Sequence, residues 1–226
     1  MYSPICPENS LSGIIIANKM NVRCIEVDVM LSKDKVPIIF NDYTLDRCCG
    51  NSAKIKDRTY EQLLKYDISK SFYVSDRFED ERIPLMKTVI QKCNELNMIL
   101  NIEIKCLEDD IITPMIICNY IKKYGNAKNL VVSSFNEKSL IIAKTILREY
   151  ERNLISYTIP IDFINKMNRL NCTSIILSSE KNSFQDILKL LKYQHPVFVF
   201  TVNDSQECEN IYQMEYVYLQ IIHIQL

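Results

Sequence analysis

The chain has 226 residues, of which 27 are basic and 28 are acidic, so its formal net charge is −1. This length fits one domain with a large core, and an α/β barrel of about 250 residues would be a natural size. The lack of a basic surplus argues against nucleic acid as a partner, and no apolar run is long enough to be a transmembrane segment.

The sequence contains nine cysteines. Their odd number and irregular spacing favour reduced thiols over a disulfide framework, and most of them are expected to fill the core. The N-terminus lacks a basic region followed by an apolar stretch, so we expect no signal peptide. These features together predict a cytoplasmic protein.

The first predicted helix begins after Pro-Glu-Asn-Ser at positions 7–10, where Asn9 or Ser10 can cap it. An apolar strand from Cys24 follows and carries Glu26 and Asp28. These two carboxylates share a face, because residues two apart on a strand point the same way. On an inner face they would repel each other, and a hard cation such as Mg²⁺ or Ca²⁺ would relieve the repulsion. A solvated strand face would show the same pattern, so this strand alone does not establish a metal site.

The segment after this strand predicts a β-hairpin. Residues 32–35 read as a turn, and Val-Pro-Ile-Ile-Phe at 36–40 reads as a returning strand that ends at Asn41 and Asp42. A short helix at 60–64 and a polar surface segment at 67–82 follow. A longer helix is predicted from about Leu85 to Asn97.

A second strand with chemical interest covers residues 100–105. Its alternation places Asn101, Glu103 and Lys105 on one face and the three apolar residues on the other. A carboxylate and an ammonium two residues apart can form an ordinary ion pair. The pattern is therefore compatible with a structural role as well as with a binding site.

The remaining chain alternates between helix and strand, which is typical of an α/β protein with a parallel sheet. The predicted helices are Ile111–Lys123, Glu137–Glu151, Ile161–Leu170 and Ser183–Leu191. The predicted strands are Leu130–Val132, Leu154–Thr158, Thr173–Leu177, Val197–Val202 and Tyr216–Ile224.

Several blocks of this chain resemble the glycerophosphodiester phosphodiesterase family, in the family's order. They are Pro-Glu-Asn-Ser at 7–10, Glu26-x-Asp28, Leu-Asp-Arg at 45–47, Asn101-x-Glu103-x-Lys105, Ser-Ser-Phe at 133–135 and Thr-Val-Asn at 201–203. The resemblance implies a TIM-type (β/α)8 barrel that hydrolyses small-molecule glycerophosphodiesters to glycerol 3-phosphate and an alcohol in phospholipid metabolism. It also implies that Glu26, Asp28 and Glu103 bind Mg²⁺ or Ca²⁺ and that Lys105 faces the phosphate.

The chain departs from the family pattern in two places that concern proton transfer. The histidine that the family has before Asp42 is Asn41 here, and the family's first strand, which ends in His-Arg-Gly, is not in this sequence. We therefore expect residues 1–226 to form one barrel domain that lacks its first strand. Asn41 does not titrate at neutral pH, so impaired hydrolysis is expected.

Two other interpretations remain open. The chain could be a degenerate family member that binds metal or phosphate without turnover, or an unrelated α/β protein with coincidental motifs. Its two histidines do not restore the proton transfer. His195 precedes a strand and is expected at the opposite end of the barrel, and His223 lies in the last predicted strand, where packing or surface roles are expected.

Overall fold

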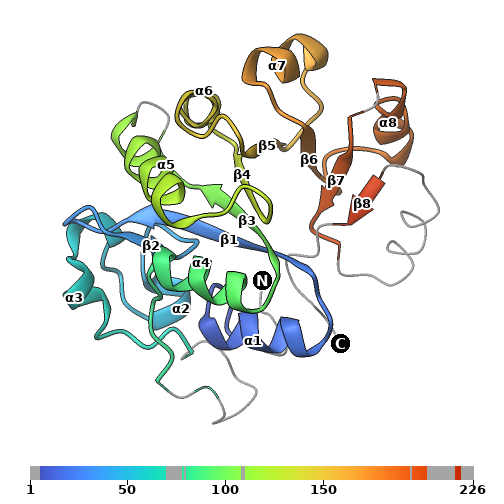
Figure 1. Cartoon of the computed structure of the whole chain (residues 1–226). Coiled ribbons are helices and arrows are strands. Elements are labelled where there is room, and N and C mark those ends of the chain that lie inside the picture. The colour runs from blue at the N-terminus through green and yellow to red at the C-terminus, as the bar shows by residue number, and fades with distance from the viewer. Residues whose placement is uncertain are drawn as a thin grey trace.

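The computed structural model of the protein describes residues 6–69, 78, 80–107, 110–193, 195–202 and 217–219. Within them, helices and strands alternate along the chain as predicted (Figure 1). Residues 70–77 and 79 of the predicted surface segment, and most of the predicted last strand, lie outside the described residues.

One sheet contains all eight described strands, in the order β2-β1-β3-β4-β5-β6-β7-β8. The predicted hairpin is formed by β1 and β2, which are antiparallel, and every other neighbouring pair is parallel. The strands are β1 (Cys24–Leu31), β2 (Pro37–Ile39), β3 (Ile99–Ile104), β4 (Leu130–Ser134), β5 (Glu151–Ser156), β6 (Ser174–Ser178), β7 (Val197–Phe200) and β8 (Val217–Leu219). Seven strands therefore run in one direction, and no ladder between described residues joins β8 back to β1 or β2.

The helices that connect the parallel strands lie on the outer side of the curved sheet (Figure 1). The helices are α1 (Leu11–Lys19), α2 (Asp46–Cys49), α3 (Tyr60–Leu63), α4 (Met86–Glu95), α5 (Ile112–Tyr124), α6 (Glu137–Ile146), α7 (Phe163–Leu170) and α8 (Phe184–Leu188). Ser10 is the residue that caps α1, because its side chain accepts a hydrogen bond from the Gly13 N–H. Among the helices in the described ranges, none has the length and hydropathy that crossing a bilayer requires.

The main core fills the space between the sheet and these helices. Ile102 and Ile104 of β3 are buried in one cluster with Val89 of α4 and Ile117 of α5. A second cluster packs β5, β6 and β7 against Phe163 and other residues of α7. Burial of each such side chain contributes roughly 1.5–3 kcal/mol, so the strand residues in these two clusters are apolar. The alternate residues of the same strands must then face the inside of the sheet.

The predicted boundary between the sixth helix and the fifth strand is wrong by several residues. The prediction continued the helix to Glu151, whereas α6 ends at Ile146 and β5 already begins at Glu151. Arg152 supplies the reason, because its buried guanidinium donates to the carbonyl oxygens of Leu147, Tyr150 and Asn171. These three carbonyls come from loops, so the residues between α6 and β5 form a turn around the side chain of Arg152.

The predicted helix Ser183–Leu191 is also too long. Ser183 caps the helix as expected, but α8 ends at Leu188 and a 3₁₀ helix covers Leu191–Tyr193. The Leu190 and Tyr193 N–H groups donate to carbonyls three residues earlier. This tighter winding is common where an α-helix ends, and the amphipathic pattern does not reveal it.

We predict that Arg152→Ala lowers the free energy of unfolding by about 3 kcal/mol or more, because three carbonyls, two of them in buried hydrogen bonds, lose their charged donor. The exposed Arg148→Ala is the matched control and should change stability by less than about 0.5 kcal/mol. Urea denaturation followed by circular dichroism measures both. Equal effects of the two substitutions would contradict this explanation of the α6–β5 boundary.

Candidate metal centre

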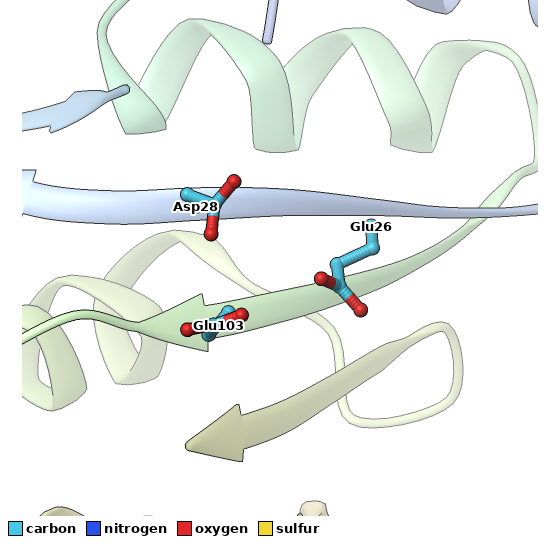
Figure 2. A group of neighbouring side chains, drawn as sticks. All are labelled: Glu26, Asp28 and Glu103. Carbon is cyan, nitrogen blue, oxygen red and sulfur yellow. The ribbon is translucent and has the colours of Figure 1, made fainter. Parts of the chain in front are cut away.

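Three carboxylates meet on the inner side of neighbouring strands. Glu26 and Asp28 lie on β1 and Glu103 lies on β3, and the parallel register pairs Asp28 directly with Glu103 (Figure 2). One oxygen from each carboxylate lies within 4.8 Å of the others. Asp28 and Glu103 are only 7% exposed, so the cluster is largely removed from water. The alternation of two strands thus produces the convergence that the sequence predicted.

Lys105 follows β3 directly and reaches the same cluster. Its Nζ lies 3.5 Å from Asp28 Oδ1 and 3.5 Å from Glu103 Oε1. Burial alone would lower the pKa of Lys105, but the Asp28 and Glu103 carboxylates outweigh burial and raise the pKa to about 12. The ammonium group therefore keeps its positive charge throughout the neutral pH range.

One ammonium group does not balance three carboxylates. Burial, together with the neighbouring carboxylate of Asp28, raises the pKa of Glu103 to about 7. The same causes, burial first and then Glu103 and Asp28, raise the pKa of Glu26 well above its usual value. The charged forms of Glu103 and Glu26 are therefore energetically unfavourable, and a divalent cation would stabilise them.

A buried amide next to the cluster supports the fit to a cation. Asn101 pairs with Glu26 in the register, and its Nδ2 donates to Glu26 Oε2 at 2.9 Å. Its Oδ1 has no hydrogen-bond partner, although Asn101 is only 6% exposed. An unsatisfied buried acceptor is unfavourable, and a bound ion or its water would provide the missing partner. The donor set of carboxylate and amide oxygens suits Mg²⁺ or Ca²⁺.

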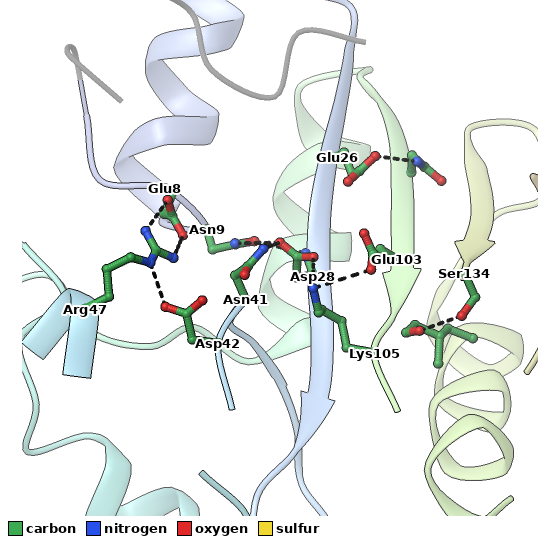
Figure 3. A network of polar contacts seen from close by, with 12 residues as sticks. Glu8, Asn9, Glu26, Asp28, Asn41, Asp42, Arg47, Glu103, Lys105 and Ser134 are labelled. Carbon is green, nitrogen blue, oxygen red and sulfur yellow. Dashed lines mark hydrogen bonds and ion pairs between the residues drawn. The ribbon is translucent and has the colours of Figure 1, made fainter. Parts of the chain in front are cut away.

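Asp28 is held in place by two asparagines that lie far apart in the sequence (Figure 3). Asn9 Nδ2 donates to Asp28 Oδ2 at 3.0 Å, and Asn9 Oδ1 accepts from the Asp28 N–H at 3.0 Å. Asn41 Nδ2 donates to the same Oδ2 at 2.9 Å. This oxygen therefore already accepts two amide hydrogen bonds, whereas Oδ1 lies 3.5 Å from Lys105 Nζ.

An ion-pair network fixes the two segments that carry these asparagines. Arg47, at the start of α2, donates through both terminal nitrogens to Glu8 and through Nε to Asp42. Glu8 and Asp42 are the chain neighbours of Asn9 and Asn41. The network thus connects the segment before α1 to the loop after β2, beside the carboxylates.

The structure brings all five predicted site residues, Glu26, Asp28, Asn41, Glu103 and Lys105, into one cluster. The cluster also includes Asn9, which the sequence predicted only as a possible helix cap. Asn9 has a φ of 53°, a left-handed conformation that asparagine tolerates better than most residues. The signal for this role in the sequence was the position of Asn9 within Pro-Glu-Asn-Ser at 7–10, one of the blocks that resemble the family. His195 bonds Thr173 O, before β6 begins, so it lies at the opposite end of the sheet as predicted, and His223 falls outside the described residues.

The chain matches the family model described as "Glycerophosphoryl diester phosphodiesterase family" over residues 2–221. A glycerophosphodiester phosphodiesterase of Caldanaerobacter subterraneus subsp. tengcongensis is 32% identical over 137 residues, which cover 59% of this chain and 55% of the relative. Glycerophosphodiester phosphodiesterase 1 of Mus musculus is 32% identical over 99 residues, covering 44% of this chain and 30% of the relative. The chain thus spans about half the length of the first relative and under a third of the second.

Solved structures share the fold over nearly the whole chain. A phosphodiesterase of Oleispira antarctica, in complex with the product sn-glycerol-3-phosphate, has a TM-score of 0.85 and 26% identity, covering 94% of this chain and 87% of that one. A glycerophosphodiester phosphodiesterase of Agrobacterium tumefaciens has a TM-score of 0.77 and 18% identity, covering 97% of this chain and 92% of that one. The predicted TIM-type barrel fold is thereby confirmed.

We predict that the metal-free protein loses stability as the pH rises from about 5 to 7.5. A carboxyl group whose pKa rises on folding, from 4.5 to about 7 for Glu103, stabilises the folded state below pH 4.5, and this contribution is lost as the pH approaches 7. The loss should be on the order of 2 kcal/mol, because the folded chain binds the proton more tightly than the unfolded chain.

Thermal unfolding in the presence of a chelator, recorded across this pH range, measures the slope. Glu103→Gln should flatten it, whereas Gln at the exposed position of Glu180 should leave it unchanged. If the metal-free protein gains stability between pH 5 and 7.5, ionisation of the cluster does not destabilise the folded state and the prediction is wrong.

Proposed function

Because the chain belongs to the glycerophosphoryl diester phosphodiesterase family, we propose that it binds a divalent cation and a glycerophosphodiester at the carboxylate cluster. We further propose that it hydrolyses the diester to glycerol 3-phosphate and an alcohol only slowly. The observation that carries the binding is the convergence of Glu26, Asp28 and Glu103 within 4.8 Å, beside Lys105. The glycerol 3-phosphate bound to the Oleispira antarctica neighbour supports a small phosphate-containing ligand.

The chain's own residues divide the binding between them. When bound, a divalent cation neutralises phosphoryl charge and polarises the phosphorus centre. Lys105 supplies a second positive charge for a phosphate oxygen, since its high pKa keeps it protonated. Asn9 and Asn41 keep the carboxylate of Asp28 in one orientation, so this carboxylate does not have to reorganise when the substrate binds.

Slow turnover is expected because the side chain at position 41 is an amide. Hydrolysis needs a proton for the leaving alcohol, and general acid–base catalysis of that kind contributes about 10²–10⁴-fold. The family pattern has histidine at this position, whereas the amide of Asn41 cannot release a proton at neutral pH. His195, the histidine in the described part of the chain, lies at the opposite end of the sheet.

One observation favours a second candidate function, metal and phosphate binding without turnover. The Asn41 side chain donates to Asp28, a carboxylate of the cluster, and so acts on the cluster instead of on a leaving group. A chain with this contact retains the binding site when proton transfer is lost. The two candidate functions share the cation and differ only in the rate of hydrolysis.

We also propose that the site prefers Mg²⁺ to Ca²⁺. Two amides already occupy Asp28 Oδ2, which leaves Oδ1 as the oxygen available to a cation. Ca²⁺ takes six to eight oxygens and readily uses both oxygens of one carboxylate, whereas Mg²⁺ takes about six ligands and keeps several waters. A site whose aspartate offers one oxygen therefore favours the smaller ion.

We predict that Mg²⁺ raises the melting temperature of the protein more than Ca²⁺ does at equal concentration. At about 100 times the dissociation constant the gain corresponds to about 2.7 kcal/mol. Glu26→Gln should remove most of this gain, and Gln at exposed Glu180 should preserve it. Asn9→Ala removes one of the two amide donors to Asp28 Oδ2 and should reduce the preference for Mg²⁺.

Differential scanning fluorimetry and isothermal titration calorimetry measure these shifts without relying on activity. No shift with either ion would refute the metal site. A larger shift with Ca²⁺ would refute only the proposed preference.

We predict that Asn41→His raises the rate of glycerophosphodiester hydrolysis by up to about 10²–10⁴-fold, because it supplies a group that can carry a proton. Asn41→Gln is the matched control, since it keeps an amide and should give no increase. The assay is release of glycerol 3-phosphate from glycerophosphocholine and glycerophosphoethanolamine in the presence of Mg²⁺. Rapid turnover by the unmodified chain would contradict the proposed impairment.

A further inference from the structure

A row of polar side chains crosses the inner side of the sheet at the level of the carboxylate cluster. The parallel registers pair Asp28 with Glu103, Glu103 with Ser133, Ser133 with Asn153, and Asn153 with Ser174. All five residues, which we call the polar row, are buried. Paired residues of neighbouring strands point to the same side of a sheet, so the polar row extends from the cluster on β1 and β3 across to β6.

Ser133 lies on the inner side of β4, next to the cluster. Its chain neighbour Val132 belongs to the core between the sheet and the helices, and successive side chains of a strand point to opposite sides. Its register partner Glu103 is one of the three clustered carboxylates. The Ser133 hydroxyl is therefore on the side of the sheet that carries the cluster, one strand away from Glu103.

The hydroxyl of Ser133 lacks a hydrogen-bond partner although it is completely buried. Ser133 is 0% exposed, and its Oγ makes no hydrogen bond to any described residue. By contrast, its register partner on β5, Asn153, accepts a hydrogen bond from Ser174 Oγ at 2.5 Å. A buried polar group without a partner is energetically unfavourable, and nearly all such groups in folded proteins are paired with protein or with ordered water. The hydroxyl therefore indicates a bound molecule beside Glu103.

The unpartnered hydroxyl has a counterpart on β3. Asn101 lies two residues before Glu103, on the same side of the strand, and its buried Oδ1 also lacks a partner within the described part of the chain. The two unpartnered oxygens thus flank Glu103, one along its own strand and one on the neighbouring strand. This placement fits the waters around a cation better than the cation itself, because Mg²⁺ keeps several waters when carboxylates bind it.

We propose that Ser133 is a positioning residue of the cation site, and that its hydroxyl binds one of the water molecules that a bound Mg²⁺ retains. This inference rests on the proposed function, because the three carboxylates hold the cation. A cation polarises its waters and makes them strong hydrogen-bond donors, and a serine oxygen has two lone pairs to accept such a bond. A serine side chain is also short, so its oxygen stays near the sheet and leaves the space beside the carboxylates to the ion and its waters.

Ser133→Ala tests the hydroxyl in both the metal-free and the metal-bound protein. In the presence of a chelator, the variant should melt at the same temperature as the unmodified chain or up to about 4 °C higher, because it removes a buried group without a partner. Isothermal titration calorimetry should show Mg²⁺ binding about tenfold weaker, since loss of an outer partner of a metal site typically costs about 10–100-fold in affinity. Binding of Ca²⁺ should weaken less, because Ca²⁺ takes more of its ligands from the protein.

Ser134→Ala is the matched control on the same strand. It also removes a completely buried serine hydroxyl, but Ser134 Oγ donates to the Ile104 carbonyl at 2.7 Å and accepts from the Asn136 N–H at 3.1 Å (Figure 3). Because these bonds exist without a cation, the variant should lower the melting temperature of the metal-free protein by about 2–4 °C. Its Mg²⁺ affinity should change by less than about twofold, well below the effect expected of Ser133→Ala.

The outcomes separate this inference from the proposed function. If the unmodified chain binds neither Mg²⁺ nor Ca²⁺, the proposed function fails and the inference fails with it. If the unmodified chain binds Mg²⁺ and Ser133→Ala binds it equally tightly, the inference alone is overturned. It is also overturned if Ser133→Ala destabilises the metal-free protein as much as Ser134→Ala does, because the hydroxyl then has a partner without the cation. A Ser133→Ala variant that keeps its Mg²⁺ affinity but binds glycerol 3-phosphate more weakly would overturn it by assigning the hydroxyl to the phosphate ligand.

Discussion

The repulsion among three buried carboxylates is the interaction on which the rest of the site depends. Two unit charges 4 Å apart near a protein surface interact by about 4 kcal/mol, and the oxygens of Glu26, Asp28 and Glu103 lie at comparable distances. Lys105 and the amide of Asn101 reduce this repulsion without cancelling it, as the raised pKa values of both glutamates indicate. The folded chain must therefore bind protons or a cation at this place.

The geometry of the cluster is set by contacts between segments that are distant in sequence. Asp28 lies in the middle of a strand, but its orientation comes from Asn9 before α1 and from Asn41 after the hairpin. The ion pairs of Arg47 with Glu8 and with Asp42 tie these same two segments together. A change in these ion pairs would reach the carboxylates through the two asparagines, which makes them part of the site although they do not face the cluster.

The inner side of the sheet has two different regions. Strands β1 and β3 contribute charge, and the ends of β4, β5 and β7 contribute aromatic rings. Lys105 and Phe135 mark the boundary between the two regions, because the register places them at neighbouring strand ends. The register therefore places charged and aromatic side chains next to each other on the inner side of the sheet.

Strand alternation is a local property, so the sequence by itself determined which side chains share a face. It predicted the hairpin, the parallel strands, and the inward positions of Glu26, Asp28, Glu103 and Lys105. It also located Asn41 at the end of the returning strand.

Periodicity contains no information about the contacts that one segment makes with another, and those contacts only the tertiary structure decided. The turn before β5 depends on the carbonyls that surround Arg152, and these come from two separate loops of the chain. Asn9 was recognisable as a helix-capping residue type, but its hydrogen bonds go to a strand nineteen residues away. Tyr157 and Phe200 become neighbours only when the sheet curves, because ring stacking is a contact across strands and leaves no pattern along one strand.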